Sequence, residues 1–169
     1  MTEQSDLSRA RIPSSIDRRM LQSYLGDHLT GASGGRARAR NIAKRYADTD
    51  MGADLSRLAE EIDEEHAHLS ELMDSLGLRP VLAMRALARA GELAGRLKPN
   101  GRLLVSPPLT PLLEIELLRA AVNGKQGLWE VLREHSTALG LDPAAYGDRA
   151  ANVETQRRLL ERLHSRLRP

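Results

Sequence analysis

Four long stretches of this chain repeat apolar residues at the 3.6-residue period of an amphipathic helix, and this pattern constrains the fold more than any other feature. The stretches cover about residues 15–47, 51–76, 110–139 and 148–167. Strands favour β-branched and aromatic residues, but the chain has only one Trp, three Tyr and no Phe. The sequence therefore predicts an all-α domain made of four helices.

The connections between the four stretches differ in length. Residues 48–50 separate the first two stretches, and a loop over residues 140–147 separates the last two. Connections this short place consecutive helices antiparallel to one another. Residues 77–110 form a much longer connection, in which the moderately amphipathic segment 81–97 predicts a short helix. We therefore expect two antiparallel helical hairpins joined by a crossover that travels the length of the bundle.

Glycine and proline mark the expected helix ends. Gly77 and Gly140 each follow a helical stretch, at the position that favours a left-handed residue. Thr110 is the expected N-cap of the third helix, with Pro111 in its first turn. Three glycines between residues 31 and 35 interrupt the first helix, and we expect them to permit either a kink or the close approach of a neighbouring backbone.

Composition excludes several classes of protein. Because there is no Cys, the chain has no disulfide, thiolate metal site or cysteine nucleophile. No run of about 18 apolar residues is present to span a membrane, and residues 1–20 are charged throughout, unlike a secretory signal. We expect a cytoplasmic protein with a flexible leader over residues 1–14 and one helical domain over residues 15–169. The preference for Arg over Lys indicates a GC-rich bacterial genome.

Two hairpins joined by one long crossover resemble the four-helix bundles of the ferritin-like superfamily. The segment 112–132, LLEIELLRAAVNGKQGLWEVL, is also similar to uncharacterised ferritin-like proteins of high-GC Gram-positive bacteria, in which an inward Glu, a Lys and a Trp mark the third helix. Here these residues are Glu114, Lys125 and Trp129, and we expect Trp129 to lie in the core. The resemblance implies a fold, whereas a fold alone does not establish an activity.

The resemblance also raises the question of a metal site. Ferritin-like proteins that bind two irons or manganeses carry a Glu on each of two helices and Glu-x-x-His on each of the other two. Similar spacings in this chain are Asp63-x-x-His66, Glu65-x-x-His68 and Glu161-x-x-His164. At about 100° per residue, Glu65 lies on the apolar stripe of its helix and His66 flanks it, whereas the other members lie at the boundary or beyond. The dinuclear motif is therefore incomplete.

The same geometry predicts an inward polar set with one or two members on each helix. Its members are His28, Glu65, Glu114, Lys125 and Gln156. A buried carboxylate needs a partner, and a lysine is a poor neighbour for a divalent cation. We therefore expect a buried polar cluster that holds no metal or other cofactor. A mononuclear iron or manganese site, held by Glu65, Glu114 and His28 or His66, is the alternative.

Charged side chains gather in two places on the expected helices. Arg36, Arg40 and Lys44 form an i, i+4 stripe on the first helix, and residues 60–65 include five acids. We interpret both as solvated faces. The arginines of the crossover, between residues 85 and 96, are the expected partners of the acidic run.

Three classes of function are consistent with these features. The favoured one is a structural or protein-interaction module without enzymatic activity, homodimeric through an exposed helix face. The second is a ferritin-like oxidoreductase or iron-handling protein that uses iron or manganese. The third is a nucleic-acid-associated protein that uses the arginine stripe, which is disfavoured because the basic residues are not gathered on one face with aromatic side chains.

Overall fold

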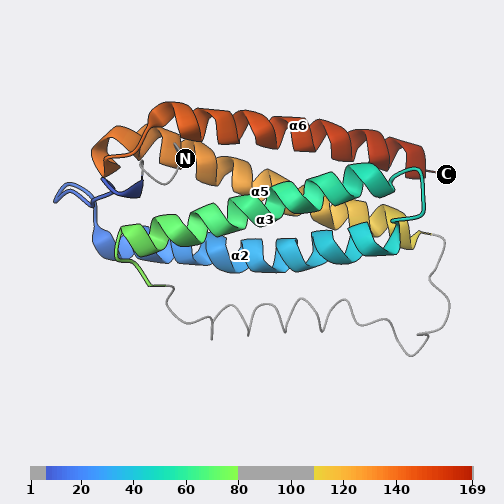
Figure 1. The fold of residues 1–169 in the computed structure, drawn as a ribbon, viewed down its shortest axis with the longest axis horizontal. Helices are drawn as coiled ribbons and strands as arrows, with labels where there is room; N and C mark the ends of the chain where they lie inside the picture. Colours follow the sequence, from blue (N-terminus) through green and yellow to red (C-terminus); the bar gives the residue numbers. More distant parts are fainter. Residues whose placement is uncertain (1–6, 80–108, 169) are drawn as a thin grey trace.

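Long helices form almost all of the part of the chain that the structure, a computed structural model, describes, namely residues 7–79 and 109–168. They are α2 (Arg18–Arg45), α3 (Gly52–Ser75), α5 (Thr110–Leu139) and α6 (Pro143–Leu167), and they lie side by side in a bundle (Figure 1). The described residues include no strand, and none of their helices is both long and apolar enough to cross a membrane. The predicted all-α class is confirmed.

The helices alternate in direction within each hairpin. Helix α3 runs back along α2, and α6 runs back along α5, so each pair is antiparallel as predicted (Figure 1). Helix α3 ends at one end of the bundle and α5 begins at the other. The chain therefore travels the length of the bundle between the two hairpins. The predicted short helix over residues 81–97, and the arginines expected to pair with the acidic run, lie outside the described residues.

Local capping explains where several helices begin and end. The carboxylate of Asp17 accepts hydrogen bonds from the backbone N–H groups of Arg19 (2.8 Å) and Met20 (3.1 Å), which otherwise have no partner within α2. Gly77 and Gly140 follow α3 and α5 with φ values of 63° and 75°. Both glycines therefore adopt the left-handed conformation that the sequence predicts at these helix ends.

Two predicted helix starts are wrong. Helix α6 begins at Pro143, because the side chain of Asp142 accepts from the N–H of Ala144 (2.9 Å) and so caps a helix where the sequence had predicted a loop. Helix α5 already includes Thr110, so the residue at its N-cap is Leu109, which makes no side-chain capping bond. Pro111 therefore located the start of α5 to within one residue, whereas Pro143 was assigned to a loop although it begins α6.

The glycines of α2 do not break the helix, which runs without interruption through residues 31–35. One of them brings two helices together: a Cβ atom added at Gly35 would lie 3.6 Å from the Cβ of Ala121 on α5. At Gly31 and Gly34 an added Cβ would meet nothing within 4 Å. The close approach that we expected therefore occurs at one glycine, and the other two leave open space.

The core consists of the apolar stripes of all four helices, which meet along the bundle axis. It includes the largest side chains, Trp129 and Tyr146, which are fully buried with ring centroids 6.2 Å apart. This position confirms that Trp129 is a core residue. Burial of such large apolar surfaces is the main contribution to the stability of the fold.

The segment before α2 differs from the flexible leader that we expected over residues 1–14. Leu7 is only 8% exposed and belongs to the core, and Ile12 and Ile16 pack against it. The N–H of Arg11 donates to the carbonyl of Leu139 (2.8 Å). Apolar side chains in this segment therefore fasten residues 7–16 to the end of α5.

Candidate functional site

A buried ion pair joins the two hairpins near the middle of the bundle. The ammonium of Lys125 on α5 donates to Oε2 of Glu65 on α3. Their side chains are only 16% and 7% exposed, respectively. The other carboxylate oxygen of Glu65 accepts from Nε2 of Gln156 (3.1 Å) and from Nδ2 of Asn152 (3.5 Å), both on α6. The buried Glu65 therefore receives hydrogen bonds from two helices.

Gln156 connects this pair to a second carboxylate. Its Nε2 also donates to Oε2 of Glu61 (2.9 Å), one turn before Glu65 on α3. The two glutamates lie on the same face of α3 because residues four apart are neighbours on a helix. The side-chain Oε1 of Gln156 is buried and has no hydrogen-bond partner in the described part of the chain.

Burial and charge act in opposite directions on Lys125. Removal from water lowers the pKa of Lys125, whereas the carboxylates of Glu65 and Glu61 raise it, and burial has the larger effect. An ammonium in this position depends on its carboxylate partner, because an unpaired charge in the interior is costly.

A cavity of about 350 Å³ lies beside the ion pair, between α2, α3 and α5. Small residues of α2 and α5, including Gly31, Ala121 and Gly124, form part of its wall and are exposed, so the cavity opens at the surface between these helices. Larger apolar side chains line the interior: Ile62, Leu69, Leu118, Val122, Leu128 and Trp129. The polar groups of the wall include Glu65 and Lys125. The cavity therefore combines an apolar body with a localised charged region.

Two histidines also line this cavity. Burial lowers the pKa of His28, and the nearby carboxylate of Asp27 opposes that shift. The ring of His28 contacts the ring of Tyr24 edge to face, with centroids 4.6 Å apart. Burial and the neighbouring Arg36 guanidinium lower the pKa of His66, whose Nε2 lies 2.9 Å from Oγ of Ser33. Both imidazoles therefore favour their neutral forms.

Glu114 does not belong to this cluster, contrary to our expectation. Its carboxylate accepts from the guanidinium of Arg45 and from the hydroxyl of Tyr46 (2.9 Å), at the far end of α2. Glu114 and Lys125 are 11 residues apart on α5, which corresponds to about 16 Å along a helix axis. Helical facing puts both residues on an inward stripe, but it says nothing about their separation along the axis.

The structure thus brings together Glu65, Lys125 and Gln156 of the predicted polar set, with His28 on the wall of the same cavity. Of the alternative metal ligands, Glu65 and His66 also line that cavity, and Glu114 lies elsewhere. Within residues 7–79 and 109–168, no three or more His, Asp or Glu side chains are grouped as metal ligands.

The histidines of the two remaining metal-like spacings contact other residues. His68 is buried, and its Nε2 lies 3.2 Å from the hydroxyl of Tyr146. His164 pairs with Glu116 of α5 (3.0 Å). The sequence argument had placed His68 at the boundary of the apolar stripe. A histidine at such a boundary becomes buried when a neighbouring helix supplies a hydroxyl partner, and the periodicity of one helix cannot reveal that partner.

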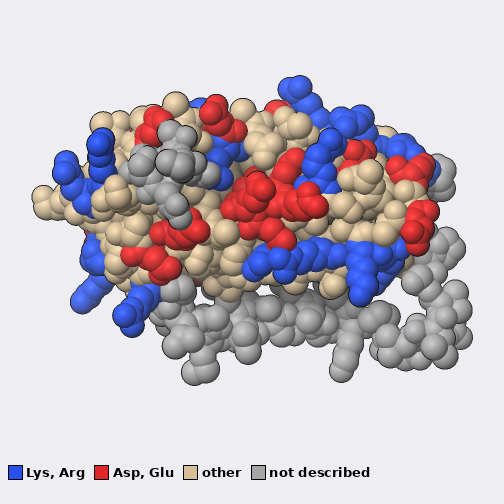
Figure 2. All heavy atoms as spheres, in the orientation of Figure 1, with Lys and Arg blue, Asp and Glu red and all other residues tan. Residues whose placement is uncertain are grey.

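Surface charges pair across the helices. Figure 2 shows acidic side chains gathered in the middle of one face of the molecule, with basic side chains beside them. Asp63 of the acidic run accepts from Nε of Arg36 and from Nε of Arg40, both at 2.7 Å. Two members of the predicted arginine stripe are therefore paired with α3, where we had expected partners from the crossover.

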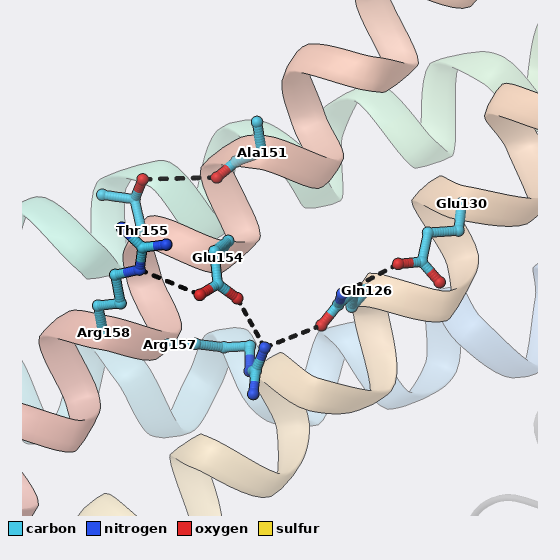
Figure 3. A network of polar contacts seen from close by, with 7 residues as sticks. All are labelled: Gln126, Glu130, Ala151, Glu154, Thr155, Arg157 and Arg158. Carbon is cyan, nitrogen blue, oxygen red and sulfur yellow. Dashed lines mark hydrogen bonds and ion pairs between the residues drawn. The ribbon is translucent and has the colours of Figure 1, made fainter.

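A second polar network connects α5 and α6 at the surface (Figure 3). Glu154 accepts from Nη1 of Arg157 (2.6 Å) and Nε of Arg158 (3.0 Å), and Arg157 also reaches Oε1 of Gln126 on α5 (3.5 Å). The side chains of Glu154, Arg157 and Arg158 are exposed, and neither they nor Gln126 line the cavity. This network therefore connects two helices without contributing to the candidate site.

Comparisons with protein-family models, with curated proteins and with solved structures found no match to this chain. The function is therefore inferred from the cavity and its charged region.

Proposed function

We propose that this chain is a ferritin-like helical bundle that acts as a non-catalytic binding module, and that it binds a small molecule in the cavity between α2, α3 and α5. The observation that carries this proposal is the cavity of about 350 Å³ beside the pair of Glu65 and Lys125. Sites for small molecules are concave, mostly apolar, about 300–1,000 Å³ in volume and supplied with a few polar groups.

The contacts of the candidate metal ligands support binding without metal. Both oxygens of Glu65 already accept hydrogen bonds, one of them from an ammonium. An iron or manganese ion at Glu65 would have to displace that ammonium or lie beside it. Glu114 is held by Arg45 and Tyr46 at another level of the bundle. Among the residues that the structure describes, no specific contact favours the oxidoreductase or the nucleic-acid hypothesis over this one.

The ferritin-like assignment is supported by the order and direction of the helices, with two antiparallel hairpins and a chain that crosses the bundle between them (Figure 1). We further propose that the protein is a cytoplasmic homodimer. The side chain of Leu113 at the start of α5 is 56% exposed and is a candidate dimer contact, which light scattering would test.

Fluorescence titration with N-phenyl-1-naphthylamine, an uncharged apolar dye, tests the binding function. We expect saturable binding of one dye molecule per chain. The chain offers matched variants, because Gly31 and Gly124 line the cavity whereas Gly34 and Gly127, on the same two helices, do not. An added Cβ meets nothing within 4 Å at any of these four positions.

The double variant Gly31→Leu/Gly124→Leu should fill the cavity and weaken dye binding by about tenfold or more, equivalent to about 1.4 kcal/mol. The control Gly34→Leu/Gly127→Leu gains the same side chains outside the cavity and should bind as the wild type does. Absence of saturable binding, or equal weakening in the two variants, would overturn the proposal.

A further inference from the structure

Lys125 leaves unused hydrogen-bond donors on the cavity wall. An ammonium has three N–H groups, and Glu65 is the hydrogen-bond partner of Lys125 among the described residues. Two donors of Lys125 are therefore left on a side chain that lines the cavity. The carboxylate beside Lys125 has little capacity left to accept hydrogen bonds, because Glu65 also accepts from the side chains of Gln156 and Asn152.

A ligand in the cavity can reach Lys125 but not the indole N–H of the neighbouring Trp129. The side chain of Lys125 lines the cavity and is 16% exposed. Trp129 also lines the cavity, but its Nε1 is fully buried. Lys125 is therefore the donor that a ligand in the cavity can use on this part of α5.

We infer that the ligand is an apolar molecule with an oxygen-acceptor head group, a carboxylate or a carbonyl, that accepts hydrogen bonds from Lys125. This inference rests on the proposed binding function and adds the chemical class of the ligand. The apolar part of the molecule contacts Leu118, Val122 and Leu128 on the same wall.

The charges of the site disfavour a ligand with a cationic head. An ammonium head would meet the ammonium of Lys125, and like charges brought together in an interface are strongly unfavourable. The two remaining donors of Lys125 would also stay unpaired. Asp27 is the other carboxylate on the wall, but it is exposed, so water screens its attraction for a cation.

Competition among three molecules with similar chains and different heads tests the inference. Octanoate, 2-octanone and octylamine would displace N-phenyl-1-naphthylamine from the wild-type protein at pH 7.5. We expect octanoate, 2-octanone or both to displace the dye at a concentration about tenfold or more below that of octylamine. Displacement by octanoate alone identifies an anionic head, and displacement by 2-octanone as well identifies a neutral carbonyl; both results support the inference.

A double variant links the preference to Lys125. The variant Lys125→Met/Glu65→Gln removes both charges, so that neither remains unpaired in the interior. It should still bind the dye but lose the preference over octylamine.

The outcomes separate the two proposals. If the dye binds and octylamine displaces it as well as the other two molecules do, the head-group inference is wrong and the binding function stands. If the preference survives in Lys125→Met/Glu65→Gln, Lys125 is not the donor and the inference is also overturned. If the dye does not bind the wild type, the binding function itself fails.

Discussion

The ammonium of Lys125 and the carboxylate of Glu65, which are 60 residues apart in the chain, form an ion pair that joins α5 to α3 inside the bundle. Interior ion pairs contribute little net stability relative to well-packed apolar residues, but removal of one partner is costly. Loss of either residue would therefore leave an unpaired charge between the two hairpins.

Lys125→Met should lower the free energy of unfolding by about 3–5 kcal/mol, because it leaves the carboxylate of Glu65 buried without its cation. Urea denaturation followed by circular dichroism would measure the change. Arg158→Met is the matched control, since the Arg158 side chain is 71% exposed in its pair with Glu154 and exposed pairs contribute about 0.2–1 kcal/mol. Equal losses in the two variants would contradict a special role for the buried pair.

Much of the fold could be predicted from the periodicity of apolar residues and from the positions of glycine and proline in the sequence. The spacing of apolar residues predicted the four helices and the long connection between the second and third of them. The positions of glycine predicted the left-handed conformations of Gly77 and Gly140. The start of α6 was missed because Asp142 and Pro143 are favoured both in loops and in the first turn of a helix. The ordered segment around Leu7 was missed because its packing partners lie on a distant helix.

The candidate site could be predicted only in part. The side of each helix on which a residue lies predicted that Glu65, Lys125 and Gln156 point into the bundle. The structure shows these side chains in contact. The same criterion also selected Glu114, because facing around a helix axis does not give position along that axis. The cavity had no sequence signal that we recognised, since it arises where glycines of two different helices leave space opposite each other.

Stability should fall as the pH decreases below about 6.5, the pKa of an unperturbed His. Burial lowers the pKa values of His28 and His66 in the folded state, so the unfolded chain takes up protons first and is favoured. The stabilisation from the neutral histidines is present above pH 6.5 and is lost as the pH falls through the pKa values of His28 and His66 in the folded state. Asp63 does not enter this window, because hydrogen bonds from Arg40 and Arg36 outweigh its burial and lower its pKa from 3.8.

Urea midpoints at pH 7.5, 6.5 and 5.5 would measure this dependence. His28→Gln/His66→Gln should give a smaller loss of stability between pH 6.5 and pH 5.5 than the wild type. Parallel curves for the two proteins would show that other groups are responsible.

Gly140→Ala and Gly34→Ala should change stability in opposite directions. At Gly140 the backbone has a φ of 75°, and an added Cβ would lie 2.5 Å from the carbonyl oxygen of Arg9. The left-handed conformation alone costs about 1–2 kcal/mol in a residue with a side chain, and the contact adds to that cost. Gly34 lies inside α2 with open space around it, so alanine should stabilise by about 0.5–1 kcal/mol. Thermal melting that shifts both variants in the same direction would contradict the backbone roles assigned to these two glycines.

Leu7→Ala should destabilise the protein by about 2 kcal/mol or more, because it empties a filled position in the core. The control Leu109→Ala removes the same atoms from a residue that is 52% exposed and should change stability by about 0.5 kcal/mol or less. Chemical denaturation would compare them. If Leu7→Ala has no more effect than the control, residues 7–16 contribute little to the fold in solution.

Elemental analysis of protein grown with iron and manganese should find well under one metal ion per chain, and dialysis against a chelator should leave the melting temperature unchanged. The physical reason is that three of the four candidate ligands are already engaged: Glu65 by Lys125, Glu114 by Arg45 and Tyr46, and His66 by Ser33. Any ion that binds the folded state alone must raise its stability. About two tightly held metals per chain, with a lower melting temperature after chelation, would contradict the metal-free function and favour the oxidoreductase or iron-handling alternative.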